Sequence, residues 1–554
     1  MFKSHPRGLI VAFFANMGER FGFYTMMAIL VLFLQAKYGL SEEKAGGIYS
    51  WFYFSIYALA LVGGIIADYT KRYKTVILVG IIIMFIGYIV MAVPGLSLTI
   101  TIVGLFVIAL GNGLFKGNLQ AVVGQMYDDP KYSPLRDSAY MIFYMGINCG
   151  AFLAPFAATG IRNWMLKSNG FLHDGSLPAQ CHQVLNGTIS NKDSFLALAN
   201  NVSLNGPVTD INLFATEYLS VFSKGYNYAF GIAAFAMIIS LLVYVFYSRL
   251  LPNKHKENKA KASNAPAEYK MPWSEEKPRL IALGLVFIVV IFFWMSFHQN
   301  GLTLTFFARD YTDKEVGPFT NLLFTLPSIL SVIGAVTGII LLLNKKLQTN
   351  IRLIGGALLV AGIGFSYYFL TQNTASNAIA PEVFQSFNPL FIVTLTFVVM
   401  GIFAWLKKKG LEPSTPRKIG IGMIIAAIGF LVVLLPSLNI ISPNELAGQP
   451  VPDSSRVSPY WLVNSYLILT IAELFLSPMG LSFVSKVAPP RFQGLMQGGW
   501  LLATALGNKL LFVGSYFWNR IEIWQLWAIF VVCCLLSAGF MFIMLKRLEK
   551  VATS

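Results

Sequence analysis

The chain has 554 residues, 56% of them hydrophobic and only 12% charged, with a mean hydropathy of +0.64. So few charges cannot cover a water-soluble surface, and the apolar residues gather into blocks of roughly 20, the length that crosses a bilayer. The excess of 41 Lys and Arg over 25 Asp and Glu lies in alternate loops. That distribution is the positive-inside pattern of membrane proteins rather than a nucleic-acid-binding surface.

Hydropathy, with charge at the helix ends, predicts fourteen transmembrane helices. The first six are expected at residues 9–35, 46–68, 75–95, 98–126, 138–160 and 226–249. The other eight are expected at residues 280–307, 320–343, 351–372, 385–406, 417–437, 458–486, 495–517 and 523–546. The first span carries Glu and Arg at its centre and has no small-residue cleavage site, so it is not read as a removable signal.

Basic runs close successive spans on one side of the membrane. They are Lys71, Arg72 and Lys74; Lys345 and Lys346; Lys407, Lys408 and Lys409; and Lys546, Arg547 and Lys550. An even number of crossings places both termini on that same side. We therefore expect a multi-pass protein of the inner or plasma membrane with both termini in the cytoplasm. The four cysteines have no metal-ligand or disulfide-framework spacing and are given no role.

The predicted spans and loops indicate an all-α protein with two helical bundles. Expected parts are an N-terminal six-helix bundle at 1–250, a cytoplasmic linker at 251–278, the first helix of a C-terminal bundle at 279–310, an extra transmembrane hairpin at 318–374 and the rest of that bundle at 384–549. A long polar segment at 161–225 is expected outside. Two six-helix bundles joined by a basic linker resemble the major facilitator fold, in which substrate binds between the halves.

Five ionisable residues within predicted spans are candidate functional residues, because burying a charge in lipid is costly. They are Glu19 and Arg20 in the first helix, Lys116 in the fourth, His298 in the seventh and Glu473 in the twelfth. Each could be a structural clamp that never meets a substrate. Opposite charges from both halves can also form a cavity that binds the two ends of a zwitterion and exchanges a proton.

A second motif lies at the end of the second helix. Gly64 and Asp68 precede the basic residues Lys71 and Arg72, which resembles the loop motif of the major facilitator superfamily. The resemblance implies that Asp68 and Arg72 act in gating, by latching one conformation. The alternative is an ordinary basic stop after a hydrophobic span.

Four segments together resemble the proton-dependent oligopeptide transporter family. They are ERFGFY at 19–24, GNGLFKGN at 111–118, FYMGINCGAF at 143–152 and ELFLSPMGL at 473–481, supported by FQSFNP at 384–389 and QGLMQGGW at 493–500. They occur in family order across both halves of the chain. The extra hairpin after the seventh helix also fits family members with fourteen helices.

The resemblance implies a peptide bound between the bundles, its carboxylate towards Arg20 and Lys116 and its ammonium towards Glu473. Further expected peptide contacts are Tyr24, Tyr57, Asn148, Asn388 and Trp500, with Trp294 as a hydrophobic wall. Each aromatic could equally serve helix packing. Proton coupling is expected to be shared among Glu19, Arg20, Lys116, His298 and Glu473.

Three positions depart from the family pattern. Asn16 stands where the motif has its first glutamate, and Met27 where many members carry a second arginine. His298 stands where members usually have the acid that pairs with that arginine, so acid and base are lost together, which avoids an unpaired buried charge. His298 could serve as a replacement proton carrier, or it could be a neutral hydrogen-bonding side chain.

These features predict a proton-driven symporter of di- and tripeptides or peptide-like molecules that acts by alternating access, as a monomer in the bilayer. Two alternatives remain: a facilitator or symporter of another small zwitterion such as a modified amino acid, and a membrane receptor that binds without transport. No cofactor other than the coupling proton and no metal is expected. An enzyme is not expected, because the sequence shows no nucleophile with a base, no metal cluster and no phosphate loop.

Overall fold

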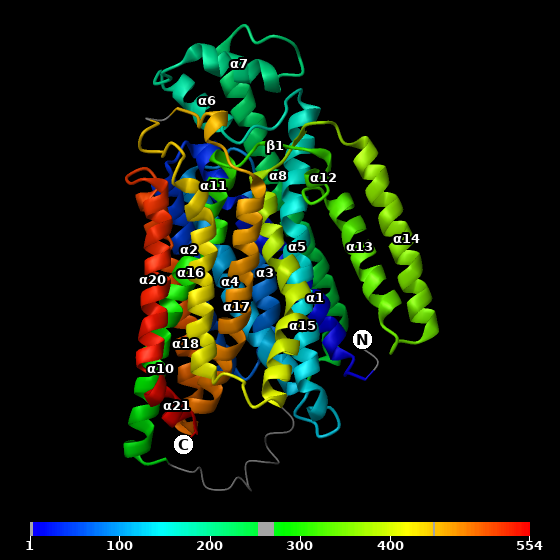
Figure 1. Ribbon diagram of the computed structural model, residues 1–554, viewed down its shortest axis with the longest axis vertical. Coiled ribbons are helices and arrows are strands. Elements are labelled where there is room, and N and C mark those ends of the chain that lie inside the picture. Colours follow the sequence, from blue (N-terminus) through cyan, green and yellow to red (C-terminus); the bar gives the residue numbers. More distant parts are fainter. Residues whose placement is uncertain (1–3, 253–270, 447–448, 554) are drawn as a thin grey trace.

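A computed structural model describes residues 4–252, 271–446 and 449–553 of the chain. Long helices run side by side along the longest axis of the molecule, and both termini lie towards the same end (Figure 1). A group of short helices covers the opposite end, which we call the cap end. The predicted all-α class is confirmed.

The first half contains six long helices. They are α1 (Gly8–Tyr38), α2 (Glu42–Thr70), α3 (Tyr73–Ala92), α4 (Leu98–Gln125), α5 (Arg136–Ser168) and α8 (Ile211–Tyr247), with short 3-10 turns η1 (Ser133–Leu135) and η2 (Ser248–Leu250). Glycines let these helices approach closely: a Cβ on Gly63 would lie 2.2 Å from the carbonyl oxygen of Gly113, and one on Gly80 would lie 2.8 Å from that of Gly111. Small residues at such crossings are what tight packing in a membrane requires.

The second half is built from six further crossings. They are α10 (Trp273–Phe297) continued by η3 (His298–Gly301) and α11 (Thr303–Asp310); η4 (Pro381–Ser386) followed by α15 (Phe387–Lys408); α16 (Thr415–Ser437); α17 (Pro459–Val487); α18 (Gln493–Lys509) with α19 (Phe512–Phe517); and α20 (Ile523–Ile543). Shorter elements are η5 (Asp453–Ser455), η6 (Pro490–Phe492) and the terminal α21 (Leu545–Thr553).

Thirteen helices among the described residues are long and apolar enough to cross a membrane. The fourteenth expected helix, 495–517, is broken into α18 and α19. Both pieces pack along α2, because Gly498 lies against Leu61 and Ser515 against Gly46. The break follows Lys509, whose ammonium lies 4.3 Å from the ring centroid of Trp51 and 4.9 Å from that of Phe512.

The extra hairpin consists of α13 (Leu326–Leu343) and α14 (Thr349–Gln372), which pack mainly on each other beside the bundle (Figure 1). Its base holds α12 (Pro318–Asn321) and two antiparallel strands, β1 (Glu315–Val316) and β2 (Asn377–Ala378). A Cβ on Gly338 would lie 2.5 Å from the amide nitrogen of Leu359, so the two helices are in close contact. The hairpin begins with α12 and then α13, rather than with one helix from residue 320.

Residues 161–225 differ from the expected polar loop. The helix α5 continues to Ser168, α8 begins at Ile211 rather than at 226, and between them lie α6 (Leu177–Leu185) and α7 (Lys192–Val202). We call residues 169–210 the cap. Its folding has a physical cause, because the aromatic rings of Phe171 and Phe195 both pack against Phe214 of α8.

The predicted linker falls mostly outside the described residues, which resume at 271. Where the chain is described again, α10 begins at Trp273, six positions before the expected boundary at 279. Pro278 is the sixth residue of this helix, so it removes one helical backbone hydrogen bond near the start of α10.

Candidate functional site

The first-helix pair forms a closed ion pair. The guanidinium of Arg20 donates to both carboxylate oxygens of Glu19, at 2.5 and 2.6 Å. Asn112 of α4 donates a further hydrogen bond to Glu19 at 2.6 Å, and both charged side chains are almost fully buried. The positive charge of Arg20 is therefore neutralised by its neighbour in this conformation.

Lys116 has a different environment. Its ammonium lies 4.0 Å from the ring centroid of Tyr57 on α2, and its side chain is partly exposed. Within the described residues it forms no ion pair, although the charges of Arg20 and Glu19 lie close enough to act on it. Lys116 is thus available to an anion that enters between the halves.

Glu473 is the acid on the opposite side. Its carboxylate accepts a hydrogen bond from Asn388 of α15 at 3.0 Å, and the same amide donates to Thr470 at 3.0 Å. Glu473 is partly exposed and has no cationic partner in the part of the chain that the structure describes. A carboxylate held by one neutral amide retains room for an ammonium group or a proton.

Three tyrosines lie close enough to Glu473 to interact with its charge. Tyr24 and Tyr57 interact electrostatically with both Arg20 and Glu473. Tyr144 of α5 interacts with Glu473 and Tyr24 and is 39% exposed, although it lies within a transmembrane helix. Charged and aromatic groups from both halves therefore meet at membrane depth. Tyr144 is absent from the expected site residues, although the fifth-helix motif contains it.

His298 lies where α10 tightens into a 3-10 turn. Its ring is stacked between Trp294, at a centroid distance of 4.6 Å, and Tyr53 of the first half, at 4.5 Å. Nδ1 lies 2.5 Å from Oδ1 of Asn508, so the ring donates this hydrogen bond. The contacts are neutral, and they favour the hydrogen-bonding alternative over a proton carrier.

Three further residues expected to contact a peptide, Asn148, Trp500 and Trp294, are largely buried or occupied by contacts within the protein. Asn148 donates to the carbonyl of Tyr144 at 2.9 Å within its own helix. Trp500 is buried, and a Cβ on Gly480 would lie only 1.9 Å from its indole, so Trp500 packs closely on α17. Trp294 is buried, and its indole N–H has no hydrogen-bond partner in the described part of the chain, which leaves a donor available next to His298.

The expected latch residues lie on either side of the end of α2, with Asp68 in its last turn and Arg72 just after it. Asp68 accepts a hydrogen bond from Tyr73, and both Asp68 and Arg72 are exposed. Lys71 between them has a positive φ of 56°, which lets the chain turn directly into α3. In this conformation the carboxylate is held within its own half.

Polar contacts between the two halves gather at the cap end. Arg162 of α5 pairs with Glu382 of η4, and both side chains are fully buried. Arg309 pairs with Glu42 at 3.1 Å, and Arg520 with Glu43 at 2.7 Å. Within the described residues, no ion pair joins the halves at the end that holds the termini. The two halves are therefore held together by ion pairs at the cap end.

No group of His, Cys, Asp and Glu among the described residues could hold a metal ion. The arrangement is instead a set of separate charges on two helical bundles that are sealed together at one end. That combination is the architecture of a two-bundle membrane carrier.

Comparison with known proteins agrees with this class. The POT family profile matches residues 73–267 and 364–523. The chain is 28% identical to the peptide transporter YePEPT of Yersinia enterocolitica, with 92% of this chain and 87% of that protein covered. It is 29% identical to the uncharacterized transporter YclF of Bacillus subtilis, again over 92% and 87%. Dipeptide and tripeptide permease A of Escherichia coli is 24% identical over 92% of this chain and 83% of its own length.

Solved structures show the same fold. A peptide transporter POT in complex with sulfate superimposes with a TM-score of 0.66 at 23% identity, covering 100% of this chain and 96% of that one. A POT family transporter in complex with a thioalcohol-conjugated peptide gives a TM-score of 0.67 at 20% identity, covering 99% and 98%. The chain belongs to the POT family and is a multi-pass membrane transporter.

Proposed function

We propose that this protein is a proton-coupled symporter that takes up di- and tripeptides or peptide-like zwitterions by alternating access. One observation carries the proposal. Lys116 and Glu473 stand on opposite halves, both partly exposed, and neither has an ion-pair partner among the described residues. Tyr57 links them, since it contacts the ammonium and interacts with the carboxylate.

A short peptide carries one positive and one negative end, which complements this pair of groups. Its carboxylate would bind Lys116, with Arg20 behind it, and its ammonium would bind Glu473. Tyr24, Asn148 and the amide of Asn388 would meet the peptide backbone, with Trp294 and Trp500 beside its side chains. Several relatives are named peptide transporter or dipeptide and tripeptide permease, which supports this substrate class.

Proton coupling follows from the same charges. Glu473 can hold either a proton or the substrate ammonium, so release of one permits binding of the other. Glu19 and Arg20 can exchange partners when a carboxylate arrives near Arg20 and Lys116. Of the five expected coupling residues, His298 has contacts that fit a positioning role better than a charge-carrying one.

The basic loops support an inner or plasma membrane location with both termini in the cytoplasm and the cap outside. Closure at the cap end then corresponds to a carrier open towards the cytoplasm. Asp68 and Arg72, which lie at the end that holds the termini, would latch the opposite conformation. The chain would act as a monomer, because one chain supplies both halves of the site.

The test is uptake of a labelled dipeptide into proteoliposomes with and without an inward proton gradient. We expect accumulation only with the gradient, and a protonophore should abolish it. Equal uptake with and without the proton gradient would contradict proton coupling. Flux of a modified amino acid in place of peptides would instead support the alternative substrate class.

That alternative has an observation of its own. Arg20 is neutralised by Glu19, and Met27 replaces a second arginine, so Lys116 alone offers an unpaired positive charge within the described site. A smaller zwitterion needs no more than this. A competition panel of peptides and modified amino acids against the purified protein separates the two. Binding without flux would favour a receptor.

A further inference from the structure

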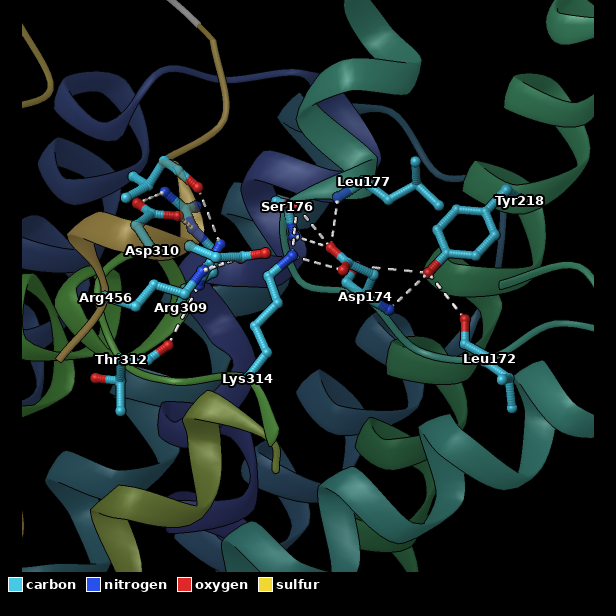
Figure 2. A network of polar contacts seen from close by, with 12 residues as sticks. Leu172, Asp174, Ser176, Leu177, Tyr218, Arg309, Asp310, Thr312, Lys314 and Arg456 are labelled. Atoms are coloured by element: carbon cyan, nitrogen blue, oxygen red, sulfur yellow. Dashed lines mark hydrogen bonds and ion pairs between the residues drawn. The ribbon is translucent and has the colours of Figure 1, made fainter. Parts of the chain in front are cut away.

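The cap is firmly attached to the first half. The hydroxyl of Tyr218 on α8 donates to the carbonyl of Leu172 at 3.1 Å and accepts from the amide of Asp174 at 3.0 Å (Figure 2). On the other side of the cap, Nε2 of His182 in α6 lies 2.8 Å from the carbonyl of Ala36 at the end of α1. The cap must therefore move together with α1 and α8.

Among the described residues, one ion pair connects the cap to the second half. Lys314, which follows α11, reaches the carboxylate of Asp174 at 2.6 Å and the hydroxyl of Ser176 at 3.0 Å (Figure 2). The other oxygen of Asp174 accepts from the amides of Ser176 and Leu177 at 2.8 and 3.2 Å. These backbone contacts orient the Asp174 carboxylate independently of Lys314, so it is preorganised to bind the Lys314 ammonium.

Two cavities lie between the cap and the second half on either side of this pair. A cavity of 560 Å³ lies between α6 and the segment before α17, with Gln180 on one side and Asn444 and Arg456 on the other. A second cavity of 320 Å³ lies between Asn191 of the cap and Asp453 of the second half. The ion pair of Asp174 and Lys314 is thus flanked by two cavities. Breaking this pair would remove a polar contact that holds the cap to the second half across that boundary.

The polarity of these contacts is also informative. In the cross-half pairs of Glu42, Glu43 and Asp174, the acid belongs to the first half and the base to the second. At the central site the order is reversed, with Lys116 on the first half and Glu473 on the second. The gate pair of Arg162 and Glu382 has this same reversed order, so the acid-first polarity groups the Asp174 pair with those of Glu42 and Glu43 and does not extend to every gate contact.

We propose that the cap is a working part of the cap-end gate, tethered to the second half by Asp174 and Lys314, and that this pair must break each time the gate opens. The substrate path then runs through the 560 Å³ cavity beneath α6. This inference concerns opening of the gate and does not depend on which substrate is carried.

The test uses a reporter that is hidden while the gate is closed. Ser515 of α19 is 1% exposed and lies against Gly46 of the first half. In a background with the four native cysteines replaced, Ser515→Cys is reacted with a bulky maleimide in nanodiscs without substrate. We expect Asp174→Asn and Lys314→Ala each to raise the labelling rate about threefold to tenfold, since they shift the protein towards the open state.

Matched controls separate the tether from general effects of charge in the cap. Asp193→Asn and Lys192→Ala change exposed residues of α7 and should leave the rate unchanged. The double variant of Asp174→Asn with Lys314→Ala should label no faster than the faster single variant, because the two side chains act as one pair. Unchanged rates in the single variants, or additive increases in the double variant, would overturn the proposal.

A second measurement is independent of the buried reporter. Spin labels at Asn191 and Ser454, both exposed, report the distance between the cap and the second half. We expect longer distances in Asp174→Asn than in the unmodified protein. Identical distance distributions would contradict the tether even if one reporter variant folded poorly. Because neither measurement uses substrate, failure of the peptide assignment would leave both results interpretable.

Discussion

The carboxylate of Glu473 is held by a neutral amide, so its negative charge is available to substrate. Replacing it with glutamine keeps the size and the contact with Asn388 but removes the charge. Since a charge-assisted hydrogen bond is worth roughly 1.5–3 kcal/mol, we expect dipeptide affinity to fall by about tenfold to a hundredfold in Glu473→Gln. Calorimetric titration measures this. Glu217→Gln, an exposed acid of α8, is the matched control, and an unchanged dissociation constant for Glu473→Gln would contradict the assigned role.

His298 offers a sharper choice between two roles. Its ring contacts two aromatic side chains and an amide, all neutral. We therefore expect His298→Gln to retain gradient-driven accumulation within about threefold, because the proton is carried elsewhere. Lys116→Gln serves as the comparison and should lose accumulation while retaining exchange. If His298→Gln also loses accumulation but keeps exchange, the imidazole is a proton carrier after all.

Some site residues could be predicted from the sequence and others could not. Glu473 and Lys116 could be singled out because charge inside a hydrophobic span is conspicuous. Arg162 and Glu382 could not, since each falls near the end of a span, where charge is ordinary, and only packing reveals their complete burial. Tyr144 lies inside a recognised motif, but which face of α5 meets the cavity is a tertiary fact.

Among the helical elements, the hairpin of α13 and α14 makes few contacts with the rest of the molecule. Its two ends meet, because Asn373 accepts a hydrogen bond from Asn321 at 2.9 Å and donates one to the carbonyl of Pro318 at 3.0 Å. We expect removal of residues 319–372, bridged by a short Gly-Ser linker, to leave a monodisperse protein. Dipeptide uptake should stay within about threefold of the intact protein, because the hairpin lines neither the central site nor the gate. Complete loss of uptake in a well-folded deletion would show that the hairpin takes part in transport.

Element prediction was accurate where hydropathy was strong and failed where tertiary contacts decided. The long apolar helices follow directly from composition, whereas the cap is polar in sequence and depends on aromatic packing against Phe214. Hydropathy also predicts the crossing of α18 and α19 as one continuous span. Its break follows Lys509, whose contacts with the rings of Trp51 and Phe512 are not visible to hydropathy.

The cap tether has a defined response to pH. Burial alone would raise the pKa of Asp174, but the Lys314 ammonium and hydrogen bonds from Ser176 hold it to about 2. Because the pKa of Asp174 is lowered, the pair contributes its full stabilisation at any pH above the ordinary carboxyl pKa. That stabilisation is lost only as the pH falls towards 2. His173 beside it is kept neutral, because burial and the Arg162 charge lower its pKa well below the usual value.

We therefore expect the tether to be insensitive to pH in the physiological range. The ratio of Ser515→Cys labelling rates between Asp174→Asn and its parent should be the same at about pH 5.5 and about pH 8. Taking a ratio removes any pH effect on the rest of the carrier or on maleimide chemistry. A ratio that falls towards one at the lower pH would mean that Asp174 is protonated there, contrary to its contacts.

For the whole molecule, closure at the cap end depends on one fully buried cross-half pair. Arg162 and Glu382 have no exposed side-chain surface, and Tyr226 donates a further hydrogen bond to Glu382 at 2.9 Å. Two charges taken out of water are tolerable together, but either one left alone carries an uncompensated cost of about 3–5 kcal/mol. Opening the gate avoids that cost by admitting water to the remaining charge.

We thus expect Arg162→Leu and Glu382→Leu each to drive the carrier strongly towards the open cap end, with labelling at Ser515→Cys at least about tenfold faster. The double variant should label more slowly than either single one, because it leaves no unpaired charge. Thermal unfolding in nanodiscs should follow the same order, with the double variant more stable than the singles. Additive effects in the double variant would show that the two side chains act independently, and closure of this end would then have to rest on the more exposed pairs around Arg309 and Arg520.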